Sequence, residues 1–132
     1  MIEKSYDKVR DVMIPEVKTI DGLATVAEAI RQMRKNSSGS LIVTKRSEGD
    51  EYGLVTMHAI ARQVIEPNLS PERVNVYEIM EKPALSVRGD MNIRYAIRLL
   101  ERMNQQSALV VDENTAIGTV SLLDMVSRYI NQ

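Results

Sequence analysis

The sequence predicts an α+β fold built from two tandem β-α-β-β-α repeats. Two observations support this prediction: the chain resembles itself at a spacing of 67 residues, and both copies carry the same order of apolar patterns. Residues 9–43 align without a gap to residues 76–110, with eight identities in 35 positions. Self-similarity at a fixed spacing indicates two copies of one structural unit.

Each repeat opens with a short β-prone stretch, at residues 17–20 and 85–87. An amphipathic helix follows, because apolar side chains recur at i, i+3, i+4 and i+7 and form one stripe. The two stripes are Val26, Ala29, Ile30 and Met33, then Ile93, Ala96, Ile97 and Leu100. Thr25 and Asn92 precede the stripes and are expected to be the N-cap residues.

A β-hairpin and a second helix complete each repeat. Residues 41–43 and 108–111 are apolar runs too short for helices and are expected to be buried strands. Polar turns follow, and strands are expected to begin at Gly53 and Ala116. A closing helix is expected in each copy, with Ile60, Ala61 and Val64 in one and Met125, Val126 and Tyr129 in the other.

The repeats are assigned to residues 8–65 and 76–130, with residues 66–75 as a linker that contains two prolines. A unit of about 60 residues buries only about 60% of the surface that its unfolded chain exposes, so it would be only marginally stable on its own. We therefore expect one integrated module, in which the repeats share a core and are related by an approximate two-fold axis.

Composition excludes several classes of function. The 132 residues carry 17 basic and 18 acidic side chains, for a net charge of −1, so nucleic acid and anionic membranes are unlikely partners. There is no cysteine, which excludes disulfides, thiolate metal sites and cysteine nucleophiles. The polar start does not resemble a signal peptide, and no apolar run is long enough to span a membrane. The cytoplasm is the expected compartment.

The residues most suggestive of a binding site lie in the stretch Gly-Thr-Val-Ser-Leu-Leu-Asp-Met at 118–125. Ser121 is a good N-cap, and Asp124 follows in the first helical turn. Free N–H groups can bind a phosphate there, and the carboxylate can hold a ribose diol. The alternative is a capping box, in which Asp124 only bonds back to the Ser121 backbone.

The other repeat differs at one informative position. Its corresponding turn is Thr56-Met57-His58-Ala59, so Ala59 takes the place of Asp124 and cannot hold a diol. The helix after Thr56 is still expected to form. The fold therefore does not require the carboxylate, which favours a ligand role for Asp124.

In these motifs the sequence resembles the cystathionine-β-synthase-type (CBS) domain pair. That family shows the same element order, an opening like Val-x-x-Val-Met, a middle like Val-x-Thr-Val, and a closing Gly-x-Val-[Ser/Thr]-x-x-Asp. The openings here are residues 9–13 and 76–80, the middles are 17–20 and 85–87, and the closings are 53–59 and 118–124. The resemblance covers roughly residues 8–130, and the order and doubling of the motifs make it specific.

The resemblance implies a regulatory module that binds an adenine nucleotide (AMP, ADP or ATP) in a cleft between the repeats and signals to an effector protein. The expected ligand-binding residues are Ile14, Pro15, Val17, Ser38, Gly39, Ser121 and Asp124. A mirror cleft would be formed with Met80, Pro83, Ala84, Gln105 and Gln106, but Ala59 makes it doubtful. Lys18 and Arg128 could each offer a cation to the phosphates, and nothing in the sequence chooses between them.

No catalytic constellation, phosphate-binding glycine loop or metal-ligand cluster occurs, so enzymatic activity is not expected. A rival interpretation is a ligand-free structural or dimerisation module, in which Asp124 is only a cap. A homodimer is expected in either case, because modules of this resemblance pair through their helices and Leu99 and Met103 extend the second apolar stripe.

Overall fold

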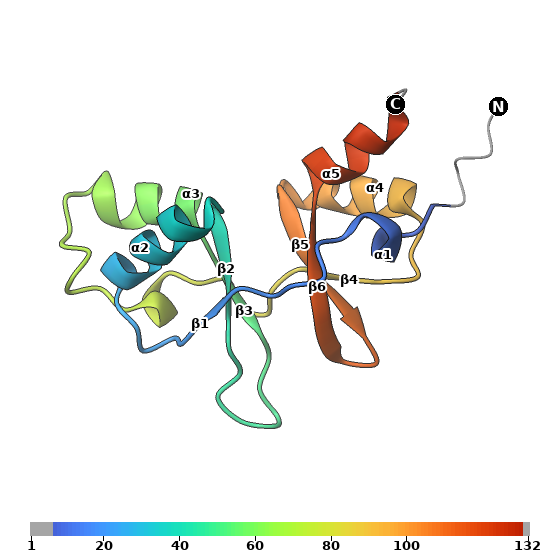
Figure 1. Cartoon of the computed structure of the whole chain (residues 1–132). Helices are drawn as coiled ribbons and strands as arrows, with labels where there is room; N and C mark the ends of the chain where they lie inside the picture. Colours follow the sequence, from blue (N-terminus) through green and yellow to red (C-terminus); the bar gives the residue numbers. More distant parts are fainter. Residues whose placement is uncertain (1–6, 131–132) are drawn as a thin grey trace. The chain divides into compact units, whose positions relative to one another are not determined.

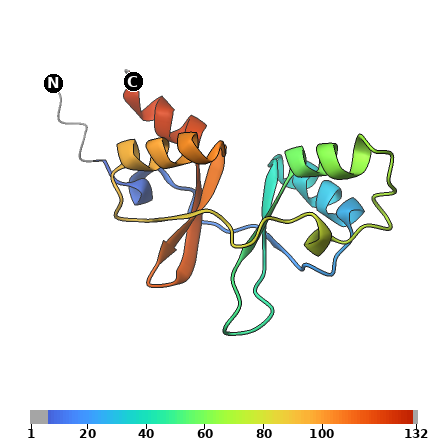
Figure 2. The ribbon, with the colours of Figure 1, turned by 180° about the vertical axis from the view of Figure 1, so that it is seen from behind.

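The computed structural model describes residues 7–130 and divides the chain into two compact units. The continuous unit is Lys18–Ala84, and the split unit combines residues 7–17 with residues 85–130. Each unit contains one three-stranded sheet with its helices (Figure 1). Figure 2 shows the same elements from the opposite side.

The continuous unit has a sheet of order β1-β2-β3, with a parallel β1–β2 pair and an antiparallel β2–β3 hairpin. Its elements are β1 (Thr19–Ile20), α2 (Val26–Asn36), β2 (Ser40–Val43), β3 (Gly53–Thr56), α3 (Met57–Ile60), the π-helical turn η2 (Ala61–Ile65) and the 3₁₀ turn η3 (Val76–Glu78). The predicted stripe residues Val26, Ala29 and Met33 are buried in the core of this unit. The predicted helix, hairpin and cap are confirmed.

The split unit repeats this arrangement, with a sheet of order β4-β5-β6 in which β4–β5 is parallel and β5–β6 antiparallel. Its elements are α1 (Val9–Val12), β4 (Ser86–Arg88), α4 (Ile93–Met103), β5 (Ser107–Asp112), β6 (Thr115–Ser121), α5 (Leu122–Val126) and the 3₁₀ turn η4 (Ser127–Tyr129). The core contains Ile93, Ala96 and Leu100 of α4, as the stripe predicts.

Local chemistry sets the ends of the main helices. The Thr25 hydroxyl accepts from the Glu28 N–H at 3.1 Å, and the Asn92 side chain accepts from the Arg94 N–H at 2.9 Å. Both side chains satisfy N–H groups that a helix start leaves free. Each helix ends where one residue adopts a left-handed conformation: Ser37 has φ 52° and Asn104 has φ 56°.

The opening segments of the two repeats are exchanged between the units. Val9 belongs to the first repeat, yet it is 0% exposed in the core of the split unit, with Val87 and Ile93. Val76 opens the second repeat and is 0% exposed in the core of the continuous unit. The backbone contacts correspond: the Val9 N–H donates to the Met91 carbonyl at 2.8 Å, and the Val76 N–H donates to the Ala24 carbonyl at 2.9 Å. Each unit therefore contains residues from both sequence repeats.

Two features differ from the predicted elements. No element was predicted for residues 9–13 and 76–80, where α1 and η3 form short helical turns. The stretch assigned as linker also contributes to the continuous unit, because the Val74 and Pro71 carbonyls accept from the N–H groups of Val26 and Ala27 at the start of α2. These contacts satisfy N–H groups of the first helical turn.

Candidate functional site

The candidate site in the split unit begins where the chain leaves α1. Ile14 forms an antiparallel bridge with Thr119 of β6: its N–H donates to the Thr119 carbonyl at 2.8 Å, and its carbonyl accepts at 3.0 Å. Gly118 makes this approach possible, because a Cβ there would lie 2.4 Å from the Ile14 carbonyl oxygen. Ile14 therefore lies beside the strand that leads to Ser121.

Ser121 forms the N-cap of α5. Its Oγ accepts from the Asp124 N–H at 3.0 Å, while its own backbone remains extended. This cap uses only the backbone of Asp124, so it does not depend on the carboxylate.

The Asp124 carboxylate does not close a capping box. Three other turns in the chain do so: the Asp11 carboxylate accepts from the Lys8 N–H at 2.9 Å, Glu28 accepts from the Thr25 N–H at 3.5 Å, and Glu78 accepts from the Asn75 N–H at 2.9 Å. Within residues 7–130 the Asp124 carboxylate makes no hydrogen bond or ion pair, although the residue is partly buried. A partly buried carboxylate without an acceptor role in the fold can receive hydrogen bonds from a ligand.

The loop before β5 also borders this turn. The Leu122 N–H donates to the Gln106 carbonyl at 2.9 Å. Gln106 was expected in the mirror cleft, and its contact with the Ser121–Leu122 turn was not predicted. The 67-residue repeat could have indicated it, because Gly39 is the corresponding residue and its carbonyl accepts from the Met57 N–H at 2.8 Å in the other unit.

The predicted site residues are divided between the units. Five belong to the split unit: Ile14, Pro15, Val17, Ser121 and Asp124. Ile14 is half exposed, at 50%, and Pro15 is exposed as well. Ser38 and Gly39 belong to the continuous unit, where the Ser38 hydroxyl lies 3.1 Å from the Ser40 carbonyl oxygen. The structure thus brings Ile14 of the first repeat onto the strand that carries Ser121 of the second.

The continuous unit contains the corresponding turn without a carboxylate. The Thr56 hydroxyl accepts from the Ala59 N–H at 3.0 Å, and Leu54 forms a two-bond bridge with Glu81, each bond 2.8 Å long. The turn therefore forms without an acidic residue, as the sequence predicts. His58 contacts Arg62 one turn further along. Ala59 offers no acceptor for ligand hydroxyls.

Lys82, which follows η3 in the continuous unit, is already paired with a carboxylate. The Lys82 Nζ lies 2.6 Å from Asp50 Oδ1, and the Arg46 N–H donates to Asp50 Oδ2 at 2.8 Å. The hydrogen bond from Lys82 and those from the backbone hold the pKa of Asp50 well below its usual range. Lys82 is the counterpart of Pro15, so this ion pair has no equivalent in the split unit.

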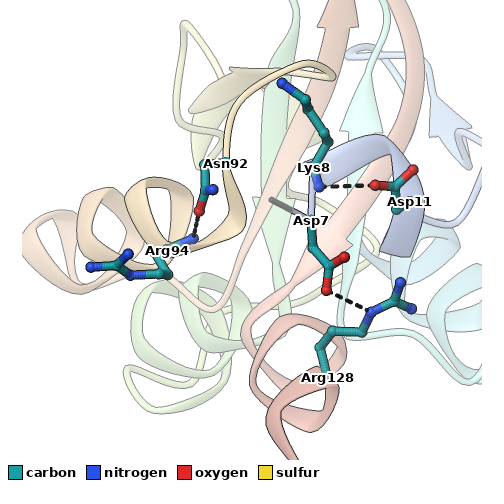
Figure 3. Close-up of polar contacts among 6 residues, drawn as sticks. All are labelled: Asp7, Lys8, Asp11, Asn92, Arg94 and Arg128. Carbon is teal, nitrogen blue, oxygen red and sulfur yellow. Dashed lines mark hydrogen bonds and ion pairs between the residues drawn. The ribbon is translucent and has the colours of Figure 1, made fainter. Parts of the chain in front are cut away.

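Of the two cations that the sequence offered for a phosphate, Arg128 is held by a carboxylate. Its Nε lies 3.1 Å from Asp7 Oδ2, as Figure 3 shows. The Asp7 carbonyl also accepts from the Ile93 N–H at 3.1 Å, so the start of the described chain contacts both α4 and η4. Arg128 is therefore a structural cation in this unit.

Comparison with known proteins now identifies the family. A family model of the CBS domain matches residues 9–66 and again residues 76–131. The chain belongs to the CBS domain family. Its two domains form a CBS pair, and proteins of this kind are typically regulatory ligand-binding modules and not enzymes.

Solved CBS proteins share the fold of this pair. The hexameric CBS-CP12 protein from bloom-forming cyanobacteria has a TM-score of 0.86 and 34% identity, covering 90% of this chain and 66% of that one. The CBS domain protein TA0289 of Thermoplasma acidophilum has a TM-score of 0.84 and 28% identity, over 96% and 70% of the chains. The CBS domain of a bacterial CNNM/CorC family Mg²⁺ transporter, solved in complex with ATP, has a TM-score of 0.77 over 95% and 88% of the chains. At 24% identity, that likeness shows the fold alone.

Two curated relatives match most of this chain in sequence. The CBS domain-containing protein YhcV of Bacillus subtilis is 26% identical over 117 residues, which are 89% of this chain and 81% of that protein. An uncharacterized protein of Methanopyrus kandleri is 25% identical over 124 residues, and the CBS pair spans 63% of its length.

None of the described helices is long and apolar enough to cross a membrane. Within residues 7–130, no three histidine, aspartate or glutamate side chains gather closely enough to hold a metal ion.

Proposed function

We propose that this CBS pair is a regulatory module that binds an adenine nucleotide, with the Asp124 carboxylate accepting hydrogen bonds from the two ribose hydroxyls. The observation that carries the proposal is that the Asp124 carboxylate does not accept a hydrogen bond from the Ser121 N–H, so the capping box at Ser121 stays open. Three acidic residues at the same helical position bond back to their caps, whereas Asp124 does not. Its carboxylate is available for a diol, which it can bind through two directed hydrogen bonds.

The surroundings of Asp124 suit a nucleoside. Ile14, 50% exposed, is bridged to Thr119 of β6, and its aliphatic side chain with nearby backbone groups offers a surface of the kind that binds a purine. Ser121 and Asp124 are the closing motif of the family, and a CBS domain of the same fold binds ATP in the CNNM/CorC transporter. We retain Pro15 and Val17, which belong to the same unit as Asp124, as further residues of the proposed site, whereas Ser38 and Gly39 remain expectations from the family resemblance. AMP, ADP and ATP are the candidate ligands.

We also propose that the pair forms a homodimer and passes nucleotide occupancy to an effector protein. Leu99 packs against the core of its own unit, so Met103 is the more exposed of the two residues expected at the dimer contact, at 53%. Larger apolar exposure lies on α5, where Leu123 is 74% and Val126 is 51% exposed. We assign the dimer contact to α5, because apolar surface of this kind is covered in assemblies.

A melting-temperature screen tests the proposal. AMP, ADP, ATP, S-adenosylmethionine and NAD are each added to the full chain in large excess. A ligand at 100 times its dissociation constant adds about 2.7 kcal/mol to the free energy of unfolding, which raises the midpoint by several degrees. A shift with adenine nucleotides supports the proposal. No shift with any of the five would favour the ligand-free dimerisation module.

A further inference from the structure

The continuous unit exposes two large apolar side chains that neither its core nor the proposed nucleotide site uses. Leu23 lies in the loop between β1 and α2 and is 63% exposed, and Tyr77 lies in η3 and is 50% exposed. Figure 1 shows η3, in olive, beside this loop. The Tyr77 N–H donates to the carbonyl of Gly22, the residue before Leu23, at 2.9 Å. The fold therefore holds both side chains close together and leaves them accessible to a partner.

Two carboxylates border this apolar pair. Asp21 Oδ1 accepts from the Leu23 N–H at 2.8 Å, and Glu78 Oε2 accepts from the Asn75 N–H at 2.9 Å. The Asn75 side chain donates to the Leu23 carbonyl at 2.9 Å, so hydrogen bonds connect the two carboxylates through Leu23 and Asn75. Within residues 7–130 neither carboxylate forms an ion pair. We call Asp21, Leu23, Tyr77 and Glu78 the η3 surface.

The split unit contains an equivalent surface with different side chains. Its backbone pairing is the same, because the Arg10 N–H donates to the Gly89 carbonyl at 2.9 Å, the length of the corresponding bond at η3. At the spacing of 67 residues, charged residues replace all four members of the η3 surface: Arg88 for Asp21, Asp90 for Leu23, Arg10 for Tyr77 and Asp11 for Glu78. Arg88 and Asp90 form an ion pair at 2.8 Å.

This comparison separates what the fold needs from what is particular to the η3 surface. The equivalent surface forms with two arginines and two aspartates, so its four members are neutral overall. The Asp11 carboxylate accepts from the Lys8 N–H, as Figure 3 shows, which is the same capping bond that Glu78 makes. The repeat therefore requires the capping bond but neither the exposed apolar pair nor two unpaired negative charges. Those two features belong to the η3 surface alone.

We propose that the η3 surface binds a short basic segment of an effector protein, with an apolar side chain against Leu23 and Tyr77 and cations against Asp21 and Glu78. Charge complementarity selects this occupant, because two unpaired carboxylates attract lysine or arginine and repel nucleic acid and anionic lipid. The face of the Tyr77 ring also attracts a cation. A second copy of the chain fits less well, since its equivalent surface offers arginines without an apolar side chain beside them.

The inference rests on the proposed function only in that a sensor needs an effector. Its observations concern the continuous unit, whereas Asp124 belongs to the split unit, so it is tested on the full chain without nucleotide. The probe is a short labelled synthetic peptide in which arginines flank a pair of leucines. One control peptide carries glutamates in place of the arginines, and a second carries serines in place of the leucines. Binding is followed by fluorescence anisotropy at low and high salt.

The arginine–leucine peptide is expected to bind, with affinity that falls as salt rises, and both control peptides are expected to bind more weakly. Asp21→Asn with Glu78→Gln removes both charges and keeps an amide oxygen for each backbone N–H. This pair is expected to weaken binding several-fold, since each exposed ion pair contributes up to about fivefold. Leu23→Ser with Tyr77→Ser is expected to weaken binding about tenfold or more, because two apolar side chains lose their burial against the peptide.

The matched control is Asp11→Asn with Asp90→Asn. It removes two carboxylates from the equivalent surface of the split unit and should leave peptide binding unchanged. All four members of the η3 surface have exposed side chains, as do the two control positions, so the variants are expected to fold. A melting curve of each variant checks this.

Four results would overturn the inference. They are equal binding of the arginine and glutamate peptides, unchanged binding after the Leu23 and Tyr77 exchanges, an equal loss in the split-unit control, and a change in oligomeric mass caused by the η3-surface exchanges. The last result would assign the surface to a second copy of the chain. Peptide binding by a protein that shows no melting shift with any nucleotide would support this inference and count against the nucleotide proposal alone. A nucleotide shift without peptide binding would do the reverse.

Discussion

Substitution of Val9 by alanine is expected to loosen the split unit, although Val9 lies in the first sequence repeat. Val9 is 0% exposed and packs in the core that contains Val87 and Ile93. The valine-to-alanine change removes two buried methyl groups, worth about 1.6 kcal/mol of transfer free energy, and the cavity left behind adds to the loss. We expect a fall of about 2–3 kcal/mol in the free energy of unfolding. Val76→Ala should cost a similar amount in the continuous unit.

Native-state hydrogen exchange distinguishes the two variants. Val9→Ala is expected to speed exchange of the β5 and β6 amides by about 30- to 150-fold, with smaller effects on β2 and β3. Val76→Ala should give the opposite pattern. Arg10→Ala is the control, because Arg10 lies on the same helix with an exposed side chain and should change stability by less than about 0.5 kcal/mol. If Val9→Ala loosened β2 and β3 instead, the exchange of opening segments would be refuted.

Three further predictions concern close packing, charge and assembly. Gly118→Ala should destabilise the protein by more than about 2 kcal/mol in urea unfolding, because the new Cβ would lie 2.4 Å from the Ile14 carbonyl oxygen, whereas Gly49→Ala, with no atom within 4 Å, should be tolerated. The pKa of Asp50 is lowered in the fold, so its ion pair with Lys82 stabilises the folded state fully above the unfolded-state pKa of about 3.9. This stabilisation is lost progressively as pH falls below that value. Acidification to about pH 3 should therefore lower the free energy of unfolding more in the parent than in Asp50→Asn. Light scattering should give about twice the chain mass of 14.9 kDa for the parent at micromolar concentration and the monomer mass for Leu123→Glu, and a monomeric parent would contradict the proposed dimer.

The elements could be predicted because several local signals agreed at each of them. At α2 the apolar stripe and the Thr25 cap both indicated where the helix begins, and the structure confirms a start at Val26. Because the sequence repeats, each element predicted in the first copy also predicted the corresponding element in the second copy. The short turns α1 and η3 were missed because four residues or fewer carry too little periodicity to indicate a helix.

The exchange of opening segments could not be predicted from the sequence. Val9 and Val76 are the same residue in the same motif, and each is compatible with the apolar core of either unit. Chain path and backbone pairing, not side-chain type, decide which core receives each valine. The sequence pattern carries no information about that choice.

The candidate site was predictable in its residues but not in its hydrogen bonds. Thr25-x-x-Glu28 and Ser121-x-x-Asp124 look alike as patterns, yet only Glu28 bonds back to its cap. The shorter Asp124 side chain does not decide the matter, because Asp11 closes its own box. Comparison with Ala59 indicated a ligand role for Asp124, and the open box is the structural observation that supports it.

Titration calorimetry of Asp124→Ala with an adenine nucleotide tests the central claim most directly, because it measures affinity and counts sites. The parent is expected to bind one nucleotide per chain. Loss of a charge-assisted hydrogen bond worth about 1.5–3 kcal/mol should weaken Asp124→Ala at least tenfold. Ala59→Asp restores the missing carboxylate and could add a second site.

The variant should remain folded, since Ser121 caps α5 through the backbone N–H of residue 124, and a separate melting curve checks this. Asp112→Ala serves as the control, because it removes an exposed carboxylate elsewhere in the split unit and should bind as the parent does. The account predicts one site in the parent and at least a tenfold loss of affinity in Asp124→Ala. Unchanged affinity in that folded variant would show that the Asp124 carboxylate does not bind the ribose, and it would contradict the assigned site.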